Sequence, residues 1–151
     1  MREKKEKALL ILILGGFLVL QWRLVGRDFY YDEIITFHEF VLSSFTHITT
    51  KYVNLNNHVL FSLIVNLYAK VAHISGEVAL AHPWALRAPC VGFSLVTLVY
   101  VWMLSGRNLY APLVLATTLP FYYYAPALRG YSLGVMLFTM VMYYAKEISD
   151  V

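Results

Sequence analysis

Two adjacent acidic residues are the side chains best suited to act as a general base. Asp32 and Glu33 follow the aromatic residues Phe29-Tyr30-Tyr31, directly after a long apolar segment. A carboxylate in this place can take a proton from a hydroxyl group. Acids are also common in the first turn of helices, so Asp32 could instead cap a helix that starts near Glu33. The spacing alone leaves both interpretations open.

Three further residues have side chains that suit an anion or a sugar. His58 ends the run Asn56-Asn57-His58, and Arg129 and Tyr131 flank a single glycine. An arginine can hold a phosphate through two parallel hydrogen bonds, and a histidine can donate another. The alternatives are a histidine that faces water, an arginine that snorkels at a helix end, and a tyrosine in an interfacial aromatic belt.

A run of four aromatic residues, 121–124, has the same two interpretations. It is typical of the belt that tyrosine forms at membrane interfaces. It could also form a shelf that holds a sugar or an isoprenoid. Nothing in the residue types decides between them.

The composition sets the environment in which these side chains must work. Of the 151 residues, 60% are hydrophobic and 14% are charged, against about 25% charged in soluble domains. A soluble domain of this length has too little interior to hide so much apolar surface. The net charge is +3, and apart from a cluster within residues 2–7 the basic residues are scattered, which argues against nucleic acid as a partner. The single cysteine, Cys90, can form no internal disulfide and has no metal-ligand spacing around it.

We therefore predict an all-α integral membrane protein with the lipid bilayer as a partner. Four apolar segments predict transmembrane helices, at about 8–25, 85–104, 109–124 and 131–145. Basic residues 2–7 precede the first of them, which predicts a cytoplasmic amino terminus and a multi-pass protein of the plasma membrane.

Between the first two spans, the pattern predicts two amphipathic surface helices in a non-cytoplasmic loop. In the first, Asp32, Thr36, Glu39, Ser43 and His47 form a polar stripe opposite an apolar one that comprises Ile34, Phe37, Val41 and Phe45. In the second, over 58–74, polar residues recur every three or four positions. That stripe favours a helix on the membrane surface over one that crosses it, although 58–74 is long enough for either.

The order of these motifs resembles the amino-terminal part of the GT-C membrane glycosyltransferases. The residues that carry the resemblance are Tyr31-Asp32-Glu33-Ile34-Ile35-Thr36, Asn56-Asn57-His58, Leu86-Arg87-Ala88-Pro89 and Ala127-Leu128-Arg129-Gly130-Tyr131-Ser132-Leu133. The nearest relatives would be transferases of the protein O-mannosyltransferase and aminoarabinose transferase type. The resemblance covers essentially all of residues 1–145.

This resemblance implies an inverting transferase that uses a polyprenyl-phosphate sugar donor on the non-cytoplasmic face. It makes Asp32 the catalytic base and Glu33 its partner, and it assigns substrate binding to His58, Arg129 and Tyr131. It implies no certain cofactor, and a divalent metal at the acidic pair remains possible in principle because carboxylates suit such ions.

Members of that family carry more spanning helices, and often a soluble carboxy-terminal domain. The resemblance therefore implies an incomplete GT-C module, active only as part of a longer chain or with a partner membrane chain. Two other classes stay open. One is a non-catalytic or degenerate protein that binds a lipid carrier. The other is a small transporter subunit, which predicts paired charges at mid-membrane depth; the sequence does not favour it, because Arg87 and Arg129 fall at the ends of predicted spans.

Overall fold

The computed structural model describes residues 2–51 and 58–150, and Asn56 and Asn57 lie outside that range. The described residues form helices and no strand. The helices are α1 (Arg2–Val25), α2 (Tyr31–Thr36), the π-helix η1 (Phe37–Val41), α3 (Phe45–Thr50), α4 (Val59–Val71), α5 (Gly76–Ala81), α6 (Trp84–Leu104), α7 (Tyr110–Thr117), α8 (Leu119–Tyr124) and α9 (Tyr131–Ser149).

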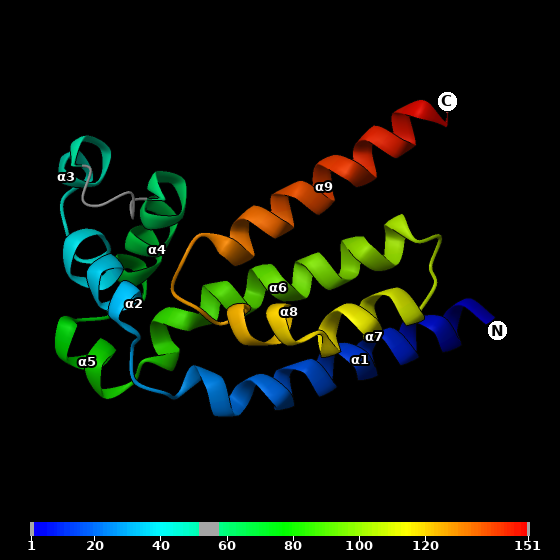
Figure 1. Ribbon diagram of the computed structural model, residues 1–151, viewed down its shortest axis with the longest axis horizontal. Coiled ribbons are helices and arrows are strands. Elements are labelled where there is room, and N and C mark those ends of the chain that lie inside the picture. The colour runs from blue at the N-terminus through cyan, green and yellow to red at the C-terminus, as the bar shows by residue number, and fades with distance from the viewer. Residues whose placement is uncertain (1, 52–57, 151) are drawn as a thin grey trace.

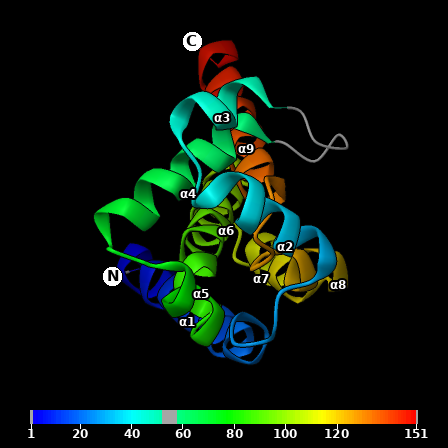
Figure 2. The ribbon, with the colours of Figure 1, turned by 90° about the vertical axis from the view of Figure 1, so that its left-hand side faces the viewer.

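The helices divide the molecule into a bundle and an end region. The helices α1, α6 and α9 run along the long axis, with α7 and α8 following one another along the same direction (Figure 1). The short helices α2 to α5 gather at one end, and the view onto that end shows them in front of the bundle (Figure 2). Both chain termini lie at the opposite end of the bundle (Figure 1).

Two of the described helices are long and apolar enough to cross a membrane. They cover Glu3–Val25 and Trp84–Leu104, with mean hydropathies of 2.2 and 1.5 in their most apolar windows. Only 22% and 44% of the residues in those windows are buried, whereas the core helix of a soluble domain would be mostly enclosed. The length and composition of these helices favour membrane association.

The other two predicted spans differ in form from these two. The segment 109–124 is broken into α7 and α8 at Thr118, whose backbone is extended with φ −67° and ψ 133°. Pro120 lies in the first turn of α8, where its missing N–H group costs no helical hydrogen bond. The segment 131–145 is helical and extends further, to Ser149.

The first predicted surface helix is not continuous, and this part of the prediction was wrong. The chain leaves η1 after Val41 and starts α3 at Phe45. Ser43 Oγ donates to the carbonyl of Glu39 at 2.7 Å, and Ser44 Oγ accepts from His47 N–H at 3.2 Å as the cap of α3. Serine hydroxyls compete in this way with the backbone of a helix. The break turns Phe45 outward, so it is exposed although the stripe placed it with Phe37 and Val41.

The second surface helix forms as α4, but its polar stripe faces water only at its far end, where Lys70 and His73 are exposed. Ser62 and Asn66 are buried, and Asn66 Nδ2 donates to the carbonyls of Val41 at 2.6 Å and Ser43 at 2.9 Å. The turns that follow η1 leave these carbonyls without helical partners, so a buried amide that reaches them is strongly favoured. The opposite face of α4 exposes Leu60, Leu67 and Val71.

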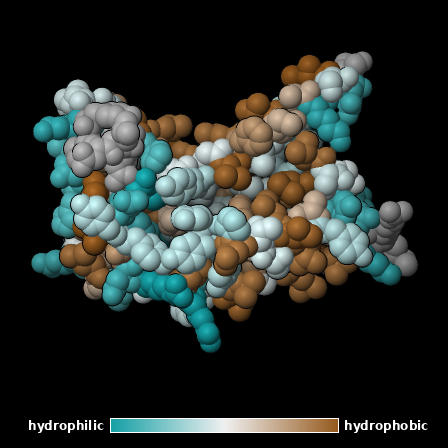
Figure 3. All heavy atoms as spheres, in the orientation of Figure 1, coloured by the Kyte–Doolittle hydropathy of each residue, from teal (hydrophilic) through white to brown (hydrophobic). Residues whose placement is uncertain are grey.

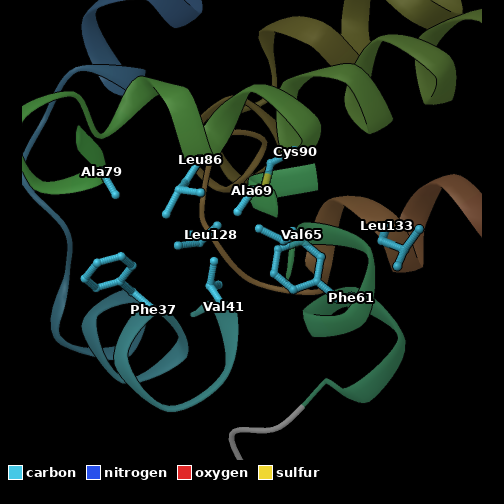
Figure 4. Packing of buried hydrophobic residues seen from close by; sticks show 10 residues of the cluster. All are labelled: Phe37, Val41, Phe61, Val65, Ala69, Ala79, Leu86, Cys90, Leu128 and Leu133. Carbon is cyan, nitrogen blue, oxygen red and sulfur yellow. The ribbon is translucent and has the colours of Figure 1, made fainter. Parts of the chain in front are cut away.

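A hydrophobic core joins the end region to the bundle. Figure 4 shows side chains from η1, α4, α5, α6, α9 and the loop before α9 pointing toward one another, and they comprise Phe37, Val41, Phe61, Val65, Ala69, Ala79, Leu86, Cys90, Leu128 and Leu133. Leu128 and Leu133 in this core lie just before and just after the predicted site residues Arg129 and Tyr131. The core therefore fixes the segment that carries them.

Candidate functional site

A buried ion pair connects the end region with the bundle. Arg87 in the first turn of α6 meets Glu33 of α2, with Nη2 and Oε2 2.6 Å apart and Nε and Oε1 3.1 Å apart. Each side chain is only 2% exposed. Charges enclosed to this degree must be paired and fully hydrogen-bonded, because their desolvation is costly.

The remaining polar atoms of this pair bind backbone groups. Arg87 donates to carbonyls at and after the end of α1, namely those of Leu24, Val25, Arg27 and Asp28. Glu33 accepts from the N–H groups of Tyr30 at 2.9 Å and Leu128 at 2.6 Å. The pair thus joins α1, α2, α6 and the loop between α8 and α9. We call these contacts the Glu33–Arg87 latch.

The latch separates the roles of the two adjacent acids. The helix α2 begins at Tyr31, so Asp32 is not its cap, and Glu33 instead reaches back to the N–H of Tyr30. Both oxygens of Glu33 are engaged with Arg87 and backbone amides. Its geometry supports a structural role and not contact with a substrate. Asp32 points elsewhere, and its side chain is 60% exposed.

Asp32 lies beside two of the predicted binding residues. Its Oδ2 is 3.1 Å from Nη1 of Arg129, which is itself nearly buried. The guanidinium carbon of Arg129 lies 5.5 Å from the centre of the Tyr131 ring, an attractive cation–π arrangement. Residues almost a hundred positions apart in the chain therefore form one charged site.

His58 completes this group at the start of α4. Its ring centre is 6.0 Å from that of Tyr131, and its side chain packs against Gly130. A Cβ atom at position 130 would lie 2.8 Å from His58 Cγ, so a side chain there would push the ring away. Burial, and secondly the nearby Arg129 charge, lower the pKa of His58 below its ordinary value. The imidazole is therefore neutral near pH 7.

The cluster offers hydrogen-bond donors that its own residues do not use. Within the described part of the chain, Arg129 Nε and His58 Nε2 are buried without a hydrogen-bond partner. The helix α9 starts at Tyr131 with no side chain capping its first turn, so its positive end adds to the same region. Buried donors without acceptors suit an anionic ligand.

An apolar cavity begins where this cluster ends. It has a volume of about 570 Å³ and lies between α6, α7, α8 and α9, within the size range of ligand sites. Tyr131, which contacts Arg129, lines this cavity together with Leu115, Phe121, Tyr124 and Val135. A charged group and an elongated apolar group could thus be bound side by side.

The acidic pair is not arranged as a metal site. Glu33 is directed at Arg87, and Asp32 at Arg129. Among residues 2–51 and 58–150, no group of three or more histidine, cysteine, aspartate or glutamate side chains is placed to hold an ion. The side chains present therefore do not fit the divalent metal that the sequence left open.

The sequence motifs assign Arg87 no role of its own, although a signal for one exists. An arginine in the first turn of an apolar helix is costly unless it is paired, so its presence indicates a buried acidic partner. The choice of Glu33 over Asp32 as that partner depends on the helical rotation between neighbours, which the sequence does not show.

Replacing the two acids should separate their roles in a stability measurement. Glu33→Gln leaves the Arg87 charge enclosed without its partner, and we expect a loss of about 3–5 kcal/mol in the free energy of unfolding. Asp32→Asn, at an exposed side chain, should cost less than about 1 kcal/mol. Thermal unfolding of the wild type and both variants in detergent measures the two losses in stability. Equal stabilities would mean that the latch does not hold the fold.

Comparison with known proteins gives no family for this chain. No family model, no curated protein and no solved structure matches it.

Proposed function

We propose that this chain acts in a membrane glycosyltransferase that takes a sugar from a polyprenyl-phosphate donor. One observation carries the proposal: Asp32, Arg129, Tyr131 and His58 meet at the end of an apolar cavity. An anionic head and an apolar tail describe this donor class. The motif order that resembles GT-C transferases supports the same assignment.

The proposal includes a four-span membrane arrangement. The helices α1 and α6 cross as single segments, α7 and α8 cross together, and α9 crosses last. The basic residues in the first turns of α1 favour a cytoplasmic amino terminus. The α2–α5 end, with the charged cluster, then faces the non-cytoplasmic side of the plasma membrane. The position of both termini at the other end of the bundle supports this order (Figure 1).

Arg129 is the residue proposed to hold the donor phosphate. Its guanidinium is nearly buried, always charged, and carries a nitrogen without a hydrogen-bond partner among the described residues. His58 would donate one further hydrogen bond. The prenyl chain would lie in the cavity beyond Tyr131, against Phe121 and Val135.

Asp32 is the proposed base. It would take the proton of the acceptor hydroxyl while that oxygen attacks the anomeric carbon of the sugar. The bond between this carbon and the phosphate oxygen breaks, and the phosphate leaves with the electron pair. Attack from the face opposite the phosphate inverts the anomeric centre. Without donor, Asp32 pairs with Arg129, and donor phosphate would compete for that arginine and release the carboxylate as base.

A second candidate is a non-catalytic protein that binds a lipid carrier. The cavity and Arg129 favour it equally, because both serve binding alone. It needs no base, so the two functions differ in what they require of Asp32.

The membrane arrangement predicts which positions react from outside. Cys90 is buried and is the only cysteine of the chain, so it can be replaced first and single cysteines then introduced. Cysteines at Ser44 and Ser75, in the end region, should react with an impermeant maleimide on intact cells. A cysteine at Arg107 should react only after permeabilisation. Labelling of the cysteines introduced at Ser75 and at Arg107 from the same side of the membrane would refute the four-span arrangement.

Donor binding should depend on Arg129. Replacement of a charge-assisted hydrogen-bonding group by an apolar one of similar length costs about tenfold or more in affinity, which we expect for Arg129→Met. The probe is a fluorescent polyprenyl phosphoglucose, and the chain is embedded in nanodiscs. Arg107→Met, at an exposed arginine of the opposite end, is the matched control. Equal affinity of both variants would exclude Arg129 as the phosphate ligand.

The same titration should show a pH dependence that comes from His58. The pKa of His58 is lowered in the free protein, and a bound phosphate would raise it by favouring the imidazolium. The complex then binds more protons than the free protein, so affinity rises as pH falls. The probe is a phosphodiester and keeps its charge between about pH 5 and 8, the range in which histidine titrates. A pH profile that His58→Asn leaves unchanged would contradict this.

Transfer should require Asp32. Asp32→Asn removes the base and keeps the size, and we expect a loss of about 10²-fold or more in rate. The assay follows radiolabelled sugar from polyprenyl phosphate in native membranes with matched protein levels. Asp28→Asn, an exposed acid of the preceding loop, is the control. Unchanged transfer with Asp32→Asn would remove Asp32 as the base, and absence of transfer in wild-type membranes would favour the lipid-carrier candidate.

A further inference from the structure

A continuous line of aromatic rings leads away from the charged cluster. We call it the tyrosine row: Tyr30, Tyr123, Tyr124 and Tyr131. The ring centres of neighbours lie 6.0 Å, 5.4 Å and 5.6 Å apart in that order. Tyr131 then contacts His58 and Arg129. The row begins in the turn before α2, passes along α8 and ends at the first residue of α9.

The rings of this row are held in place yet remain accessible. Tyr123 donates a hydrogen bond from its hydroxyl to that of Tyr30 at 2.8 Å, and successive rings meet tilted or edge to face. Exposed fractions of 43%, 37%, 50% and 44% along the row leave part of every ring open. In the space-filling view, residues of intermediate hydropathy gather over α8 and the start of α9, between the more polar end region and the apolar bundle (Figure 3).

This arrangement differs from an ordinary interfacial belt. A belt tyrosine needs only to sit at the depth of the lipid headgroups, without a fixed neighbour. Tyr110, at the start of α7, is of that kind, with 76% of its surface exposed and no ring contact among the described residues. The rings of Tyr100, Tyr143 and Tyr144 also contact one another, between α6 and α9. The tyrosine row differs from that group in its position, because its line of rings ends beside Asp32 and Arg129.

We propose that the tyrosine row is a saccharide-binding site that takes neutral pyranose rings by stacking. One face of a pyranose carries several C–H bonds, whose slightly positive hydrogens are attracted to the negative face of an aromatic ring. The tyrosine hydroxyls can exchange hydrogen bonds with the sugar hydroxyls at the ring edge. The inference rests on the proposed function for its biological ligand, because the sugar to be transferred must lie between the phosphate at Arg129 and the base.

The test measures sugar binding directly, without transfer and without a lipid carrier. The chain is placed in nanodiscs of deuterated lipid, and saturation-transfer NMR follows methyl α-D-mannopyranoside and methyl β-D-glucopyranoside. We expect saturation of the C–H protons above the level of empty nanodiscs. Tyr123→Leu and Tyr124→Leu keep apolar bulk but remove a ring, and either should weaken binding by about tenfold.

Two matched variants control for unrelated effects. Tyr123→Phe keeps the ring and loses the hydroxyl bond to Tyr30, so most of the sugar signal should remain. Tyr110→Leu removes an exposed tyrosine outside the row and should change nothing. Thermal unfolding of each variant shows whether the fold is retained. If Tyr123→Leu does not fold, the sugar saturation measured with Tyr124→Leu decides whether the tyrosine row binds saccharides.

Two outcomes would overturn the inference: no saturation above empty nanodiscs in the wild type, or full saturation in both leucine variants. The same nanodiscs titrated with a sugar-free polyprenyl phosphate test the proposed donor site separately, because this probe carries no sugar. Tyr124 also lines the cavity, so Tyr123→Leu is the variant that distinguishes the two sites. Sugar binding without polyprenyl-phosphate binding would remove the proposed function and keep the saccharide site. The reverse result would remove only the saccharide site.

Discussion

The ion pair between Glu33 and Arg87 is the constraint on which the rest of this structure depends. An arginine enclosed at the start of an apolar helix is tolerable only if every donor finds an acceptor, and here the acceptors come from three other segments. Satisfying one guanidinium therefore fixes the exit of α1 and the start of α2, and its partner Glu33 in turn holds the loop before α9 by accepting from the Leu128 N–H. Asp32 and Arg129 lie one residue away from latch contacts at Glu33 and Leu128, so their separation is set by the same bonds.

The fold concentrates its charge where an apolar cavity meets an accessible surface. Arg129 sits in a poorly solvated position, in which electrostatic attraction is stronger than in water. Its pairing with an exposed carboxylate keeps the region neutral without sealing it, unlike the enclosed latch. Two acid–arginine pairs formed by adjacent acids thus have different environments. Burial and saturation of all hydrogen bonds distinguish a pair that holds the fold from one that can exchange partners.

The sequence predicts the two long helices α1 and α6 well and the end region poorly, for a physical reason. Long apolar segments have one dominant way to satisfy their backbone, so α1 and α6 follow from composition alone. Short helices depend on tertiary contacts. The side chain of Asn66 is buried because it donates hydrogen bonds to the carbonyls of Val41 and Ser43. The order of the motifs assigned Asp32, Arg129, Tyr131 and His58 to one site through the resemblance. It gave no indication that Glu33 is buried against Arg87, because a partner distant in sequence leaves no local periodic signal.

The exposed apolar side chains of α4 bear on how the end region can be isolated. The helix buries Phe61, Val65 and Ala69 together with Ser62 and Asn66, and it exposes Lys70 as well as two leucines, at positions 60 and 67. Exposed apolar patches of this kind drive self-association in water. Residues 26–83 cut free from the bundle would lose the Arg87 contacts and still carry that apolar face. The region between the first and second long helices is thus no detachable domain: its shape depends on the Arg87 contacts, and its exposed apolar side chains favour an amphiphilic environment over water.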